Sequence, residues 1–317
     1  MNDQLKNEII ASAKQYMESK GMSQNVLARE SKVNVGYLSS MLKNEYVVIM
    51  GEKEVQIQDK WFLAIAEYIG YRIEKTIWET QSTPQFLAIL GLLEHAKKYP
   101  QAIRIIGETG SGKTFATDKF VNAHPLHTYR ITVSDNFRVK DILDGICDLM
   151  NIPNNGLSVD KLLRIKRKVI EEKRSGNEPM IIIDEAENLK AQSLMVCKAL
   201  YDYVIDYASV VLIGTQDMIT KIDNMVKKGV AGMPQVQRRW KAGTRYLMPI
   251  DTSFKEFLKG FGFEQGLNRL LTILCSNYGE LHDYIVHGLR EAERMQQPLT
   301  ENLFRLIFNM PKPSKKY

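Results

Sequence analysis

The chain has 317 residues, of which 44% are hydrophobic and 25% charged, a composition typical of a globular protein rather than a disordered or fibrous one. At roughly 150 residues per domain, this length favours two domains over one. No stretch approaches the roughly 18 consecutive apolar residues of a membrane-spanning helix, and the polar start lacks the apolar block of a signal peptide, so we expect a cytoplasmic protein without a membrane partner. Cys147, Cys197 and Cys275 are too far apart for a metal knuckle and are expected to be buried, reduced thiols.

Positive charge is concentrated in the later part of the chain. The net charge is +6, yet the first 80 residues contain 10 Lys or Arg against 11 Asp or Glu. Residues 221–245 contain a single acid, Asp223, and seven basic residues: Lys221, Lys227, Lys228, Arg238, Arg239, Lys241 and Arg245. We interpret this segment as the best candidate for contact with DNA, because Lys and Arg neutralise its phosphates. A second basic cluster, residues 161–174, has the apolar spacing of an amphipathic helix, and a solvated face and DNA contact remain equal alternatives for it.

Residues 1–75 are expected to form a helical domain without strands. Ser23 is a plausible N-cap of a short helix, and a second short helix follows at residues 34–44. Two short helices at a tight turn resemble the DNA-binding helix-turn-helix of phage repressors. This resemblance implies that the second helix presents Asn34, Tyr37, Ser39, Ser40 and Lys43 to the major groove. The alternative is a helical bundle that binds protein, and the balance of −1 over the first 80 residues favours it.

A glycine-rich loop follows the apolar, β-branched run at residues 102–106, which is typical of a strand. The loop matches G-x-x-x-x-G-K-[ST] and consists of Gly107, Glu108, Thr109, Gly110, Ser111, Gly112, Lys113 and Thr114. Its glycines allow successive N–H groups to face a phosphate. Lys113 adds a point charge near the β and γ phosphates, and Thr114 supplies a hydroxyl for Mg²⁺. The sequence therefore predicts a site for ATP and Mg²⁺.

Polar residues end two further apolar runs. Residues 180–183 are predicted to be a buried strand that ends at Asp184, which can hold Mg²⁺, and Glu185, which can orient the attacking water. Residues 210–213 are predicted to be a third strand, and at its tip we expect Thr215, with Gln216 as the second choice, to bridge that water and the γ phosphate. The alternatives are an acid pair that merely caps the next helix and a threonine that only helps the chain to turn.

Three such strands with helices between them predict an α/β fold, in which helices cover both faces of a parallel sheet. We assign residues 76–250 to this core and residues 251–317 to a helical lid domain. Ile273 and Leu306 are among the apolar residues expected in the core of the lid. A short basic tail follows, with Lys312, Lys315 and Lys316.

The order of these motifs is similar to that of the AAA+ ATPases. The resemblance implies an arginine finger that completes a neighbour's site, for which we prefer Arg239 to Arg238, and DNA contact is the alternative for both. It also implies an ATP-sensing lid residue, usually an arginine in a Gly-Ala-x-Arg pattern, whereas here Gly279-Glu280-Leu281 is followed by His282. Histidine is shorter and largely neutral at pH 7, so we expect a weak ATPase with little sensing through His282.

Over most of its length the chain resembles the phage Mu B family of transposition proteins. The similarity includes the helix-turn-helix ahead of the ATPase core, the ETQ tripeptide at residues 79–81, residues 276–292 and the basic tail. It implies ATP-driven assembly of a homo-oligomer, a helical filament or ring, on double-stranded DNA of little sequence preference. It further implies that the transposase of the same mobile element stimulates ATP hydrolysis and disassembly. Two alternatives stay open, a helicase loader or replication initiator and a nucleotide-switched helix-turn-helix regulator.

Overall fold

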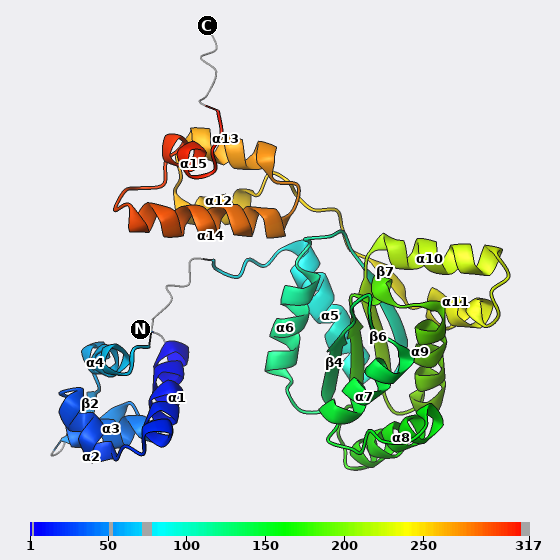
Figure 1. Cartoon of the computed structure of the whole chain (residues 1–317), viewed down its shortest axis with the longest axis horizontal. Coiled ribbons are helices and arrows are strands. Elements are labelled where there is room, and N and C mark those ends of the chain that lie inside the picture. The colour runs from blue at the N-terminus through cyan, green and yellow to red at the C-terminus, as the bar shows by residue number, and fades with distance from the viewer. Residues whose placement is uncertain (2, 51–52, 72–77, 312–317) are drawn as a thin grey trace, which may run out of the picture. The chain divides into compact units, whose positions relative to one another are not determined.

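The computed structural model describes residues 1, 3–50, 53–71 and 78–311, and the chain divides into two compact units, Met1–Ile77 and Trp78–Tyr317 (Figure 1). The domain boundary expected at residues 75 and 76 lies outside the described residues, as do the tail lysines Lys312, Lys315 and Lys316. Within the described part of the chain, no helix is long and apolar enough to cross a membrane. All three cysteines are free and buried, as predicted.

The N-terminal unit packs its helices around a small apolar core. Its helices are α1 (Asp3–Lys20), α2 (Gln24–Glu30), α3 (Val35–Leu42) and α4 (Asp59–Ile69). Ser23 is the N-cap of α2, as predicted, and its hydroxyl accepts a hydrogen bond from the Val26 N–H at 3.4 Å. Leu27 of α2 and Leu38 and Met41 of α3 are fully buried, so the two short helices share one core.

The expectation that this unit contains no strand is wrong. Strand β1 (Val47–Met50) pairs with β2 (Lys53–Gln56) in antiparallel register, with Val48 opposite Val55. Valine and isoleucine fit extended backbone because branching at Cβ restricts their side chains in a helix. Four-residue strands are too short for a periodicity search, which explains why the pattern of residues 1–75 indicated helices alone.

The second unit is built on a parallel sheet with the strand order β4-β5-β6-β3-β7. The strands are β3 (Ala102–Ile106), β4 (Thr128–Thr132), β5 (Met180–Asp184), β6 (Ser209–Gly214) and β7 (Thr244–Tyr246). The helices are α5 (Pro84–Lys98), α6 (Lys113–Ala123), α7 (Val139–Leu149), α8 (Ser158–Arg174), α9 (Ala191–Val204), α10 (Gln216–Lys227) and α11 (Met233–Lys241). The fold is therefore the predicted α/β fold, and β3, β5 and β6 lie where the apolar runs placed them.

Alternate residues of the strands point to opposite faces of the sheet. Ile181 and Ile183 of β5 belong to the core under α7, α8, α9, α10 and α11. Ile182 belongs to the second core, under α5 and α6. Figure 1 shows α5 and α6 on one side of the sheet and α8 and α9 on the other. All five residues of β3 and of β5 are buried, which is expected for central parallel strands covered on both faces.

Two strands of the sheet were not predicted, because their sequences are not continuous apolar runs. β4 reads TYRIT, with polar residues at three of its five positions. β7 has only three residues and lies inside the basic segment at residues 221–245. Both are edge strands, and an edge strand needs less apolar sequence than a central one.

The C-terminal part of the second unit is helical, as expected for the lid. Its helices are α12 (Lys255–Phe261), α13 (Gln265–Leu274), α14 (Tyr278–Arg294) and α15 (Glu301–Ile307). Their core includes Phe257, Leu271, Leu281 and Ile285. Ile273 and Leu306 are instead 75% and 67% exposed, so their predicted place in the lid core is wrong. Helical spacing identifies apolar residues on a helix, but a helix in a small layer buries only one stripe.

Gly243 is required where the chain enters β7. A Cβ at this position would lie 1.9 Å from the carbonyl oxygen of Ala102. We expect Gly243→Ala to lower the free energy of unfolding by about 3 kcal/mol, because the backbone of β7 would have to move away from β3. Gly91→Ala, in the exposed part of α5 with nothing within 4 Å, is the matched control. It should raise the stability by about 1 kcal/mol. Urea unfolding of both variants measures the difference, and equal effects would contradict this account.

Candidate active site

The glycine-rich loop lies at the carboxyl ends of the central strands, where ligands of open parallel sheets bind. The Gly107 N–H donates to the Gly214 carbonyl at 3.1 Å, which ties the start of the loop to the end of β6. Gly110 and Gly112 have φ values of 73° and 81°, a region that favours glycine, and α6 begins at the next residue, Lys113. The loop is therefore preformed at a helix N-terminus, the backbone arrangement that binds phosphate.

Lys113 folds back over the loop. Its ammonium donates to the carbonyl oxygens of Gly107 at 3.0 Å and Glu108 at 2.8 Å. Burial lowers the pKa of Lys113, and the neighbouring carboxylates oppose this shift, Glu187 most strongly and then Asp184. A cation held in a half-buried place beside a helix N-terminus is well placed to meet an anionic ligand.

Asp184 and Thr114 face each other across the start of α6. Asp184 is 1% exposed at the end of β5, and its Oδ2 accepts a hydrogen bond from Thr114 Oγ1 at 3.3 Å. A hydroxyl and a carboxylate are oxygen ligands of the kind that Mg²⁺ prefers, so these two residues fit the metal. No group of three or more His, Cys, Asp or Glu side chains in the described residues could hold a metal ion by itself. The fit is therefore to a Mg²⁺ ion shared with phosphates.

Glu185 follows Asp184 in a left-handed conformation, with φ of 54°. Its N–H donates to Asp184 Oδ1 at 2.9 Å, and its carboxylate accepts a hydrogen bond from Asn188 Nδ2 at 3.4 Å. The side chain is exposed, so it has access to water. These contacts place the acid pair at the strand tip where the sequence predicted it.

Three polar atoms near the loop are buried without a hydrogen-bond partner: Ser111 Oγ, Glu187 Oε2 and Thr215 Oγ1. Thr215 follows β6 directly, and a Cβ at Gly214 would lie 2.6 Å from Glu187 Oε2, so these two groups belong to the same strand tip. Buried polar groups are nearly always paired in folded proteins. Their position beside the loop indicates that a ligand or water completes their hydrogen bonds. Glu187 was not predicted, although its spacing of two residues after Glu185 was visible in the sequence.

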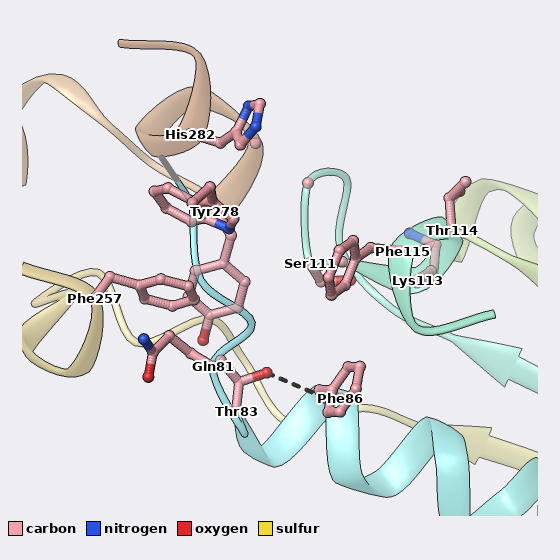
Figure 2. Close-up of a pocket in the computed structure, with 14 residues that line it drawn as sticks. Gln81, Thr83, Phe86, Ser111, Lys113, Thr114, Phe115, Phe257, Tyr278 and His282 are labelled. Atoms are coloured by element: carbon pink, nitrogen blue, oxygen red, sulfur yellow. Dashed lines mark hydrogen bonds between the residues drawn. The ribbon is translucent and has the colours of Figure 1, made fainter. Parts of the chain in front are cut away.

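A pocket of about 380 Å³ lies between the loop and the lid. Figure 2 shows Phe86 and Phe115 on the loop side and Phe257 and Tyr278 on the lid side. The wall is completed by loop residues from Gly110 to Thr114 and by Trp78, Gln81, Thr83, Gly279 and His282. Rings and a few polar groups are typical of a site that takes a flat organic ligand. His282 was predicted to lie at the nucleotide site, but the Trp, Phe and Tyr residues were not, because they come from separate segments that only the fold brings together.

The lid contacts the loop through the start of α14. The Tyr278 N–H donates to the Gly110 carbonyl at 3.1 Å, and the buried Tyr278 hydroxyl donates to Gln85 Oε1 at 3.1 Å. Gln85 Nε2 in turn donates to the carbonyls of Met248 at 3.0 Å and Pro249 at 2.7 Å. Lid, α5 and the segment after β7 are thus joined by one chain of hydrogen bonds.

His282 presents its ring to the aromatic side of the pocket. The ring lies edge-on to Trp78, with 5.2 Å between centroids, and Nδ1 lies 2.9 Å from Asp283 Oδ1. The residue therefore lines the pocket, and its imidazole already has an aromatic and a carboxylate neighbour.

The basic residues predicted to bind DNA differ in their surroundings. Lys221 donates to the carbonyl oxygens of Glu187 and, at 3.5 Å, Leu189, and Arg239 pairs with Asp202 at 2.6 Å. Arg245 donates to the Ala242 carbonyl at 2.9 Å but is exposed. The other four are also exposed: Lys227, Lys228, Arg238 and Lys241.

The residues predicted to read DNA in the N-terminal unit also have intramolecular contacts. Asn34 Oδ1 accepts hydrogen bonds from the N–H groups of Gly36 at 2.8 Å and Tyr37 at 3.4 Å, so this side chain caps α3. The ring of Tyr37 packs against Trp61 at 6.1 Å. Lys43 is exposed at the C-terminal end of α3.

Comparisons with known proteins agree with this geometry. A family model described as an AAA domain matches residues 96–222. Mu-like prophage FluMu DNA transposition protein B of Haemophilus influenzae is 24% identical over 242 residues, which are 73% of this chain and 76% of that protein.

Solved structures share the fold. The Aeropyrum pernix ORC2 protein in ADPNP–ADP complexes has a TM-score of 0.53 at 15% identity and covers 74% of this chain and 71% of its own. CDC6P from Pyrobaculum aerophilum has a TM-score of 0.53 at 16% identity, with 71% and 68% covered. The predicted AAA+ fold is confirmed, and domain and fold together support an ATPase that binds nucleotide.

The Tyr278 hydroxyl should contribute measurably to the docking of the lid. We expect Tyr278→Phe to lower the free energy of unfolding by about 1 kcal/mol, because it leaves the buried Gln85 Oε1 without its donor. Tyr284→Phe on the same helix is the control, since that ring packs against Phe304 and Phe308 and the change preserves it. Thermal unfolding of the two variants tests the difference, and a Tyr278→Phe variant as stable as the control would refute the role of this hydrogen bond.

Proposed function

We propose that the chain is an ATP-dependent DNA-binding ATPase that assembles on double-stranded DNA and delivers target DNA to a transposase, because it has an AAA domain and is similar to a Mu-like transposition protein B. Hydrolysis is weak and acts as a timer for disassembly, and DNA and the transposase stimulate it. One observation carries the nucleotide part of this proposal. A preformed phosphate loop, unpartnered buried polar atoms and an aromatic pocket lie side by side at the carboxyl end of the sheet.

The site divides into a phosphate half and a base half. The backbone N–H groups of the loop and Lys113 bind the phosphates, while Thr114 and Asp184 hold Mg²⁺. Bound Mg²⁺ supplies positive charge to the β and γ phosphates. The base stacks among Trp78, Phe86, Phe115 and Tyr278, where Gln81 offers polar atoms to its edge.

Hydrolysis is assigned to the strand tips. Glu185 is exposed and held by Asn188, so it can accept a proton from water at the γ phosphate. Thr215 has a buried hydroxyl without a partner, which suits a bridge between that water and the phosphate. His282 faces Trp78 in the aromatic half, so we assign it to the wall of the pocket and not to sensing of the γ phosphate.

The exposed basic residues supply the DNA surface. Lys227 is the last residue of α10 and Lys228 follows it, Arg238 and Lys241 lie on α11, and Arg245 lies on β7. We exclude Lys221 from this surface because its ammonium donates to two backbone carbonyls. For the finger in a neighbour's site, Arg238 is exposed whereas Arg239 is paired with Asp202, so the structure favours Arg238.

Imaging of the purified protein on long duplex DNA tests the function directly. We expect assemblies with a slowly hydrolysed ATP analogue and none with ADP or without nucleotide, because ATP binds between protomers and only the assembled state gains that energy. Filter binding in the three states gives the same comparison in solution. Equal DNA binding in all three states would overturn the proposal, and preference for single-stranded DNA would favour a helicase loader.

The salt dependence of that binding identifies the surface. Lys227→Ala with Lys228→Ala should reduce the slope of log affinity against log salt by about 2, because two phosphate contacts are lost. Lys255→Ala with Lys259→Ala removes the same charge from exposed residues of the lid and is the control.

Turnover separates the two halves of the site. We expect Glu185→Gln to reduce ATP turnover by about 100-fold, because a carboxamide cannot accept the proton of the attacking water. His282→Ala should leave turnover unchanged, since its ring lines the aromatic wall. Phosphate release under saturating ATP measures both rates, and a large loss for His282→Ala would mean that the lid residue takes part in hydrolysis.

A further inference from the structure

Arg130 lies between two carboxylates, one of which belongs to the metal site. This arginine is on β4, an edge strand next to β5, and its side chain is 13% exposed. Its Nη2 donates to Asp184 Oδ2 at 2.7 Å, and its Nη1 donates to Asp118 Oδ1. Asp184 is buried, whereas the side chain of Asp118 on α6 is 54% exposed. One guanidinium therefore bridges a buried acid at the strand tip and an acid at the surface.

The contact involves the same oxygen atom that faces Thr114. Asp184 Oδ2 accepts the hydrogen bonds of both Thr114 Oγ1 and Arg130 Nη2, while Oδ1 accepts the Glu185 N–H. Mg²⁺ held by Thr114 and Asp184 would bring its charge close to this guanidinium. Two cations beside one carboxylate in a half-buried place repel each other, because burial weakens the screening by water.

We propose that Arg130 is a positioning residue that holds Asp184 in the absence of metal and sets the Mg²⁺ concentration at which ATP binds. The guanidinium pairs with both Asp184 and Asp118 when no metal is bound, and it would keep only Asp118 when Mg²⁺ binds. This inference rests on the proposed function, namely that the site takes ATP together with Mg²⁺.

The geometry leaves Arg130 with one acid when it gives up Asp184. Arg130 contacts both acids, so rotation of the guanidinium away from Asp184 breaks that ion pair and keeps the one with Asp118. Its Nε is buried without a hydrogen bond, so Arg130 is not fully satisfied where it lies. A buried Asp184 without any cation would be costly, which explains why a cation is kept there. Metal binding is thus coupled to Arg130, which lies on β4 and pairs with Asp118 on α6, the helix that begins at the end of the phosphate loop.

Variants of the two partners should shift the Mg²⁺ requirement in opposite directions. Arg130→Met removes the competing charge, and we expect the Mg²⁺ concentration for half-maximal binding of adenylyl imidodiphosphate to fall about tenfold. Asp118→Asn leaves Asp184 as the only acid for Arg130, so the required Mg²⁺ concentration should rise. Arg130→Lys keeps the charge but lacks the planar guanidinium fork that contacts the two acids. Its Mg²⁺ concentration for half-maximal binding should lie between those of Arg130→Met and the wild type. Calorimetry over a series of Mg²⁺ concentrations measures all four proteins.

The matched control is Arg164→Met, because Arg164 lies in the same unit and donates to the carbonyl of Pro153 at 3.0 Å, away from the site. Thermal unfolding without Mg²⁺ gives a second readout. Arg130→Met should unfold at a lower temperature than the control. Mg²⁺ and nucleotide together should raise its unfolding temperature by more than they raise that of the control. If Arg130→Met does not fold, the Mg²⁺ requirements of Asp118→Asn and Arg130→Lys test the role of Arg130 instead.

The outcomes separate this inference from the function on which it rests. If the wild type binds the analogue and Arg130→Met needs the same or more Mg²⁺, the role of Arg130 is overturned while the nucleotide site stands. If the wild type binds no analogue at any Mg²⁺ concentration, the proposed function itself fails.

Discussion

The backbone hydrogen bond from Gly107 to Gly214 is the contact on which the arrangement of the site depends. It fixes the start of the phosphate loop against the end of β6, and β6 also pairs with β5, which ends at Asp184. Parallel strands in register bring their carboxyl ends to one edge, so the loop, the acid pair and Thr215 meet there although they are far apart in sequence. The preformed loop reduces the entropy that a phosphate ligand would otherwise have to remove.

The lid gives this edge its second wall. Tyr278 contacts the loop through its backbone and α5 through its hydroxyl, so one residue positions α14 against both. The aromatic pocket exists only because of that docking, since Trp78, Phe115 and Tyr278 lie in different parts of the chain. Movement of the lid would therefore change the aromatic pocket and leave unchanged the glycine-rich loop, which is tied to the sheet.

Charge has two different roles in this molecule. Arg130, Lys221 and Arg239 are held by internal acids or carbonyls, and they organise the strand tips and the helices around them. Lys227, Lys228, Arg238, Lys241 and Arg245 remain exposed and account for the proposed DNA surface. A positive net charge alone does not distinguish these roles, because burial and partners decide whether a cation can reach a phosphate.

The sequence by itself determined the central strands, the phosphate loop, the acid pair and the lid helices. Each of these follows from a local sequence pattern: a continuous apolar run, glycines at fixed spacing, or apolar residues at helical spacing. The tertiary structure alone decided the β1–β2 hairpin, the edge strands β4 and β7, the aromatic pocket and the partners of Arg130 and Lys221. These features depend on contacts between distant segments, and a local pattern contains no information about which side chains the fold will bring within a few ångströms of one another.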